Sequence, residues 1–214
     1  MFNHQSEHSD YFRESLPQSI SKEILRKIMK GELVPGDKIV EENIASELET
    51  SRAPVREALY LLQVNGIVDR IPRKGTVVKS FTRDDISDYI EVMVHIIQYG
   101  IVGVSRVWND THKEKWQQLY EDVLTYYGRQ DLIHYQHSAE LMLRYVMYLA
   151  DNKALMRFYE EANQILNVFA QVQWNQETMI QFHKQFAKFV EALAEANFEE
   201  AKQFARYALK EGEV

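Results

Sequence analysis

Two arginines in the stretch SRAPVREAL (51–59) are of the type and spacing that suit the reading of DNA bases. Arg52 and Arg56 are four residues apart, so in a helix both guanidinium groups project from the same face, near its start. A guanidinium can donate two parallel hydrogen bonds to a guanine, and the N-terminal end of a recognition helix is the part that meets base edges. Ser51, at the expected N-cap, suits a phosphate. The alternative is a solvated helix end, with Arg56 paired to Glu57 or facing water.

A second basic group follows in RIPRKGTV (70–77), where the proline and glycine indicate a tight turn. Arg73, Lys74 and Gly75 would lie at the tip of this turn, within reach of the DNA backbone or a minor groove. An N-cap serine, two arginines on one face, an Asn65-Gly66 helix stop and a basic hairpin occur together. That coincidence favours DNA binding over a solvated surface.

The elements that must position these residues can be read from the hydrophobic spacing. Helical periodicity predicts helices over 19–29, 41–48 and 51–64, with a short extended piece at 38–40. Ser51 is expected to cap the third helix through its hydroxyl, and Pro54 falls in the first turn, where a missing N–H is tolerated. The β-rich segments 67–71 and 76–79 predict a small hairpin. This order is that of a winged helix-turn-helix.

The rest of the chain predicts a bundle of about six helices. No glycine occurs between Gly128 and Gly212 and no proline after Pro72, while apolar residues recur at helical spacing. The expected helices cover 84–108, 112–127, 131–150, 153–173, 176–196 and 198–210. We therefore expect a mostly α protein with an N-terminal tail (1–15), a winged helix-turn-helix domain (16–80), a linker (81–83) and an all-helical domain (84–214).

Composition narrows the function classes. The net charge is −7, but residues 1–80 carry 12 Lys and Arg against 12 Asp and Glu, which leaves 13 against 20 for residues 81–214. A neutral N-terminal part can still present a local basic face to phosphates. The chain has no cysteine, and it shows no secretory signal and no membrane-length apolar run. We expect a cytoplasmic protein. Motifs of phosphate-binding loops, serine hydrolases and zinc proteases are absent, so we expect no enzyme.

The segment ELETSRAPVREALYLLQVNGIVDRIPRKGTVV (47–78) resembles the winged-helix signature of the GntR family of bacterial transcription regulators. The helical remainder resembles the FadR-type effector domain, called FCD. The resemblance implies a homodimer on a palindromic DNA operator, contacted by Arg52, Arg56, Arg73, Lys74 and Gly75. One position departs from the pattern: Glu42 stands where some relatives carry an arginine, and a carboxylate near phosphates is unfavourable.

Many FCD domains hold a metal through an aspartate and three histidines, and bind the carboxylate of an effector through an arginine. The segments 139–155, 186–193 and 88–97 resemble the parts that carry these residues. Apolar residues stand at every aligned position: Ala139, Leu143, Phe186 and Ala208 at the metal ligands, and Met93 and Ile97 at an arginine and a glutamate. The resemblance therefore implies no metal and no cofactor in this chain.

Three interpretations of the helical domain remain open. A pocket lined by Met93, Ile97, Ala139, Leu143 and Phe186, with His183 one turn away, would accept an apolar or acyl-type effector. The same residues would equally form a filled core in a domain that only dimerises. A rearranged metal site would use His95 and His183 to sense a carboxylate. The interpretation with an effector pocket predicts a ligand-responsive regulator, which we expect to be a repressor. Its partners would be operator DNA, a second copy of the chain and a small-molecule effector.

Overall fold

The computed structural model describes residues 15–80 and 82–213, which form two compact units on either side of residue 81. The expected tail (1–15) lies outside the described residues except for Ser15, and so does residue 81 of the expected linker. These two ranges contain nine helices and one three-stranded sheet. The mostly α fold, with an N-terminal winged helix-turn-helix and a C-terminal helical bundle, is confirmed.

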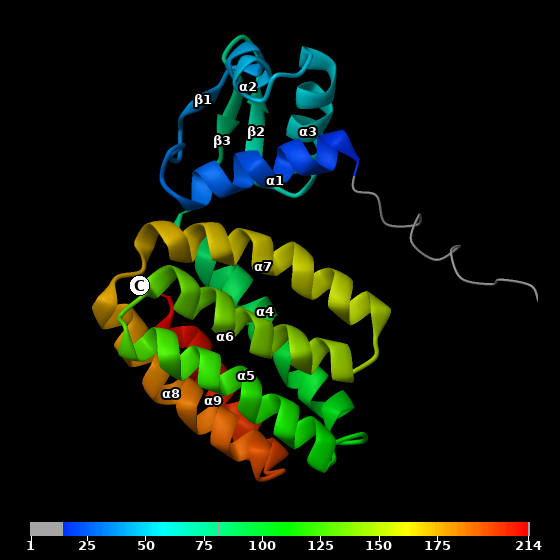
Figure 1. Ribbon diagram of the computed structural model, residues 1–214, viewed down its shortest axis with the longest axis vertical. Coiled ribbons are helices and arrows are strands. Elements are labelled where there is room, and N and C mark those ends of the chain that lie inside the picture. The colour runs from blue at the N-terminus through cyan, green and yellow to red at the C-terminus, as the bar shows by residue number, and fades with distance from the viewer. Residues whose placement is uncertain (1–14, 81, 214) are drawn as a thin grey trace, which may run out of the picture. The chain divides into compact units, whose positions relative to one another are not determined.

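The N-terminal unit contains three helices, α1 (Leu16–Met29), α2 (Glu41–Glu47) and α3 (Arg52–Val64). Its strands are β1 (Lys38–Ile39), β2 (Val68–Ile71) and β3 (Gly75–Val78), as Figure 1 shows. The expected hairpin is β2 and β3, and the piece expected to be merely extended pairs with β3 as well. Lys38 lies opposite Val77 and Ile39 opposite Thr76, so the antiparallel sheet has the order β1-β3-β2.

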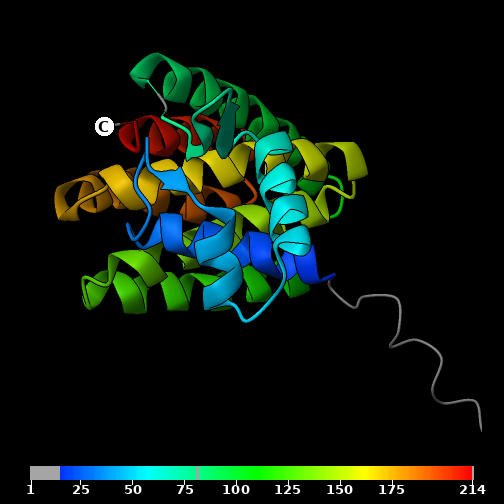
Figure 2. The same ribbon diagram turned by 90° about the horizontal axis from the view of Figure 1, so that it is seen from above.

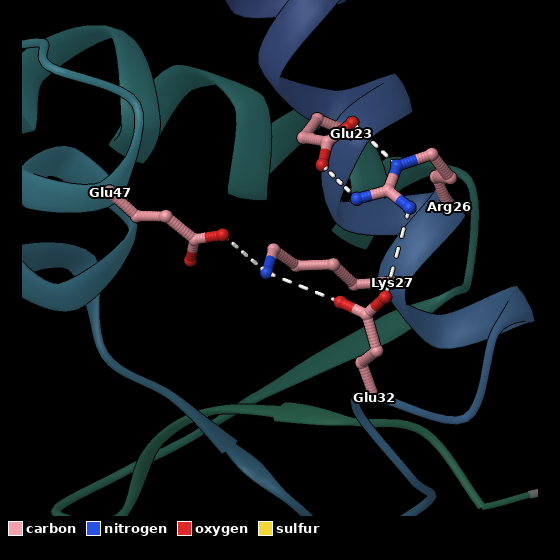
Figure 3. Close-up of polar contacts among 5 residues, drawn as sticks. All are labelled: Glu23, Arg26, Lys27, Glu32 and Glu47. Atoms are coloured by element: carbon pink, nitrogen blue, oxygen red, sulfur yellow. Dashed lines mark hydrogen bonds and ion pairs between the residues drawn. The ribbon is translucent and has the colours of Figure 1, made fainter.

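The core of this unit lies between α1 and α3, which cross in both views (Figure 1 and Figure 2). Ile24 and Ile28 of α1 are fully buried, and so is Val55 of α3. Ion pairs join the ends of these elements (Figure 3). Lys27, near the end of α1, contacts Glu32 in the turn after α1 and Glu47 at the end of α2. The core leaves the opposite face of α3 in solvent.

The C-terminal unit consists, in its described part, of six helices close to those expected. They are α4 (Arg83–Val104), α5 (Asp110–Gly128), α6 (Leu132–Leu149), α7 (Lys153–Gln173), α8 (Gln176–Ala194) and α9 (Phe198–Glu211). Helix α4 ends four residues before the expected Trp108, because the chain turns at 105–107 and Asn109 caps α5. Side chains cap the starts of all six helices: Thr82, Asn109, Asp131, Asn152, Asn175 and Asn197.

Helix α4 packs against α6, α7 and α9, and α8 packs against α9 and α5. Large aromatic side chains fill the centre, among them the fully buried Trp116, Tyr135 and Phe189. Two glycines allow α4 to approach α6 closely. A Cβ added to Gly103 would lie 2.7 Å from Cα of Ala150, a separation too short for two carbon atoms.

Candidate nucleic-acid interface and internal cavity

The exposed face of α3 carries both arginines. Helix α3 buries Val55, Ala58, Leu59 and Leu62, and this apolar stripe turns Arg52 and Arg56 toward solvent. Their side chains are each 58% exposed. The structure thus brings the two guanidinium groups together at the N-terminal end of α3, as the spacing predicts, and the solvated alternative with Glu57 as partner is not what is observed.

The carboxylate partner is Glu41, in the first turn of α2. Arg56 donates from Nε to Oε1 of Glu41 at 3.2 Å and from Nη2 to Oε2 at 2.9 Å. Arg52 Nη2 lies 3.6 Å from the same Oε2. The hydrogen bond from Arg56 lowers the pKa of Glu41, and the pair raises the pKa of Arg56. Glu41 is therefore ionised at neutral pH and joins both arginines.

Ser51 differs in part from the expectation. It occupies the N-cap with an extended backbone, but its side chain makes no capping hydrogen bond. An N-cap hydroxyl accepts from the backbone N–H of the second or third helical residue, and the third residue of α3 is Pro54, which has no N–H. The hydroxyl of Ser51 is thus not engaged by its own helix.

The turn between β2 and β3 presents the second basic group. Lys74 N–H donates to the carbonyl of Ile71 at 3.1 Å, and Arg73 between them has a φ of 66°. Proline at the second position and positive φ at the third are typical of a type II turn, which usually places glycine where this chain has Arg73. A non-glycine residue in this region stores backbone strain.

Two basic residues near the turn were not predicted. Lys38 on β1 lies beside the turn, where a Cβ added to Gly75 would be 3.2 Å from its Cε. Arg70 on β2 lines two adjoining surface hollows, one shared with Arg56 and the other with Arg73 and Lys38. Basic side chains therefore extend from α3 to the tip of the wing. The pairing of β1 with β3, which the sequence did not reveal, is what brings Lys38 there.

The C-terminal unit contains a partly open pocket of about 80 Å³ between α4, α6, α7, α8 and the end of α9. Three of the six residues that the sequence analysis assigns to a pocket line it: Met93, Ala139 and Leu143. The other three expected residues lie elsewhere: Ile97 and Phe186 are packed in the core, and His183 belongs to a separate aromatic cluster. Phe182, one turn before Phe186, lines the cavity instead.

Polar residues at the cavity were missed by the sequence reasoning. Gln136, Glu140, Asn163 and Asn167 contribute to its wall. Oε1 of Glu140 accepts from Nε of Arg144 at 2.9 Å and from Nδ2 of Asn163 at 3.2 Å. Gln136 donates from Nε2 to the carbonyl of Ala170 at 3.1 Å. The cavity is therefore largely apolar, with a carboxylate and amides at its edge.

His183 is held by tyrosines. Its Nδ1 lies 3.2 Å from the hydroxyl of Tyr135, and its ring stacks on Tyr127 with the ring centres 3.8 Å apart. Burial lowers the pKa of His183 and raises that of Tyr135. At neutral pH both groups are accordingly uncharged, and His183 serves as a packed hydrogen-bonding residue.

Comparison with known proteins assigns the N-terminal unit. Residues 16–78 match the family described as bacterial regulatory proteins, gntR family. The N-terminal unit is a GntR-family domain. The match covers α1, the helix-turn-helix and the wing, and thus every residue of the interface described above.

Curated relatives match this domain. The chain is 28% identical over 79 residues to the uncharacterized HTH-type transcriptional regulator YdhC of Bacillus subtilis, covering 37% of this chain and 35% of that protein. It is 36% identical over 73 residues to the gluconate operon transcriptional repressor of B. subtilis, covering 34% of this chain and 30% of the repressor. The matches span about a third of the length of these relatives.

Solved structures share the whole fold. A GntR regulator from Rhodococcus sp. RHA1 has a TM-score of 0.81 at 18% identity, covering 94% of this chain and 96% of that one. E. coli McbR/YncC has a TM-score of 0.76 at 15% identity, covering 92% of this chain and 95% of that one. The architecture of a GntR-family domain followed by a helical unit is thus shared, at identities that establish the fold alone.

In the helical unit, the described residues contain no cluster that would bind a metal. Among the residues that the structure describes, no three His, Asp or Glu side chains converge on one point. His95 is exposed on α4, and His183 is enclosed by tyrosines. No helix in the described ranges combines the length and apolar character needed to cross a bilayer.

Proposed function

We propose that this chain is a transcription regulator, not an enzyme, that binds a palindromic operator as a homodimer in the cytoplasm. The carrying observation is the pair Arg52 and Arg56, exposed together at the N-terminal end of α3 in a GntR-family domain. That end of a recognition helix meets base edges in the major groove, and paired half-sites match a two-fold symmetric protein. Arg73, Lys74 and Gly75, with Ser51, complete the proposed contacts. The name of the gluconate operon repressor, a relative, supports repression as the mode of action.

The test replaces Arg52 and Arg56 by alanine, singly and together, and measures affinity for DNA from the protein's own promoter. A bidentate contact to guanine contributes about 1–3 kcal/mol, so each replacement should weaken specific binding roughly 5- to 150-fold. Arg157→Ala is the matched control, because Arg157 is an exposed arginine of the helical unit. Specific binding that survives the double replacement would refute the proposal.

For the helical unit we propose that the cavity binds a small effector, with Met93, Ala139 and Leu143 in its wall. The apolar lining supports an apolar ligand. The volume of about 80 Å³ is far below the roughly 300–1,000 Å³ of sites for drug-sized ligands, so an acyl chain would require the wall to open. In the alternative proposal the helical unit only dimerises, and the same pocket is a packing defect that binds no ligand. Native mass spectrometry of the purified protein would report the dimer and any bound molecule together.

A further inference from the structure

We propose that Glu41 is a specificity-determining residue of the DNA-reading surface, which holds Arg56 and Arg52 in position for base contacts. The inference rests on the proposed DNA-binding function and assigns a role to a carboxylate within the surface that approaches DNA. An acidic residue at this place weakens attraction to phosphates, so its contribution must lie elsewhere.

The position of Glu41 is better fixed than that of the arginines. Its side chain is 21% exposed, against 58% for each arginine. Glu41 is the first residue of α2, where a helix N-terminus favours a negative charge; α2 packs against α3, and its Ile44 and Ala45 are buried. The carboxylate therefore sets where the guanidinium groups lie, and not the reverse.

The pairing leaves Arg56 able to read a base. A guanidinium has five N–H donors, and Glu41 takes one from Nε and one from Nη2. The opposite edge, formed by Nη1 and the second hydrogen of Nη2, still offers two donors side by side. That edge can form a bidentate pair with O6 and N7 of guanine while Glu41 keeps its own hydrogen bonds. Arg56 thus reaches the DNA already ordered, and less side-chain entropy is lost on binding.

The same carboxylate opposes unspecific binding. It places one negative charge against two positive charges, which reduces the local attraction for any DNA backbone. Specific binding recovers this loss through base contacts made by an ordered guanidinium, whereas unspecific binding does not. Glu41 should therefore lower affinity for random DNA and increase the ratio between specific and unspecific affinity.

The experiment measures the affinity of the full chain for its selected site and for a scrambled duplex of equal length, at several KCl concentrations. In E41Q the ratio of the two affinities should fall about 2- to 10-fold, as expected for freeing one long side chain. Unspecific binding should tighten. The slope of the logarithm of its affinity against the logarithm of the KCl concentration should steepen by up to the amount that about one phosphate contact contributes. E42Q is the matched control, because Glu42 is the exposed neighbour on α2 and makes no ion pair within the described residues. It should tighten unspecific binding while the ratio stays within about twofold of the parent.

A second variant separates position from charge. E41D keeps the charge but shortens the side chain, so the salt dependence should stay as in the parent while the ratio falls. A ratio that is unchanged in both E41Q and E41D, or that falls equally in E42Q, would overturn the role of Glu41. A parent protein that binds both duplexes equally would instead overturn the proposed function, and the role of Glu41 with it.

Discussion

Replacement of Gly103 by alanine should destabilise the helical unit, although alanine is normally the better helix residue. In an exposed helix, glycine to alanine gains about 0.5–1 kcal/mol of stability. Here the new Cβ would lie 2.7 Å from Cα and 2.8 Å from Cβ of Ala150 at the end of α6. Carbon atoms in contact normally stand about 3.5–4.0 Å apart, so the α6 backbone must move by most of an ångström.

Such overpacking typically costs about 1–3 kcal/mol, and a backbone obstacle lies at the upper end of that range. After subtraction of the gain in helix propensity, we expect the variant G103A to lose about 2 kcal/mol. With a urea dependence of about 2 kcal/mol per M, the midpoint of unfolding should fall by about 1 M.

The assay is urea unfolding followed by tryptophan fluorescence. All three tryptophans of the chain, Trp108, Trp116 and Trp174, lie in the helical unit, so the signal reports that unit alone. Gly128→Ala is the matched control, because a Cβ there has no neighbour within 4 Å and should stabilise α5. At Gly100 the nearest atom is the end of the Met147 side chain, which can rotate, so G100A should fall between the two. A G103A protein as stable as the parent would refute the close approach of α4 and α6.

Two further predictions concern the wing and the buried histidine. Arg73→Gly removes the strain of a non-glycine residue at a φ of 66°, so the free energy of unfolding should stay the same or rise by up to about 1 kcal/mol. The affinity for DNA should fall, and its dependence on salt should weaken by the amount that about one phosphate contact contributes. Arg73→Ala keeps the strain, and equal stability of the two by amide hydrogen exchange in β2 and β3 would contradict the argument. Burial lowers the pKa of His183 from its ordinary value of 6.5. As the pH drops, the histidine of the unfolded chain therefore takes up a proton before that of the folded chain. The free energy of unfolding should accordingly decrease as the pH falls from 6.5 toward the folded pKa. His183→Asn should remove this loss in acid melting curves, and a variant that retains it would exclude His183 as the source.

The elements of the candidate interface were predictable where their signals in the sequence are local. The periodicity of 51–64, the Asn65-Gly66 stop and the turn at 72–75 are each contained in a few consecutive residues, and the structure forms α3 and the wing there. The prediction that the Ser51 hydroxyl caps α3 was wrong, although Pro54 in the sequence already removes the N–H at the third helical position. Glu41 was not predictable in this way, because its partner Arg56 is fifteen residues away and only the packing of α2 on α3 joins them.

The cavity was harder to predict for a similar reason. Met93, Ala139 and Leu143 were found, but a shift of one turn on α8 exchanges Phe182 for Phe186, and no local signal decides which one faces the void. Asn163 and Gln136 have the polar side chains typical of a solvated helix face. Their place in the wall of the pocket depends on the neighbouring helices that pack around them.

The small cavity also bears on how a ligand would act on DNA binding. An effector changes DNA affinity only if it binds two conformations of the protein unequally, and a tenfold change requires a difference of about 1.4 kcal/mol. A molecule that fits the void of about 80 Å³ unchanged meets no such difference from the wall. A larger molecule would have to displace side chains of the wall such as Leu143, and it would therefore bind a conformation with a wider pocket. An effector of that size would bind the wider conformation selectively, and its binding could then change the affinity for DNA.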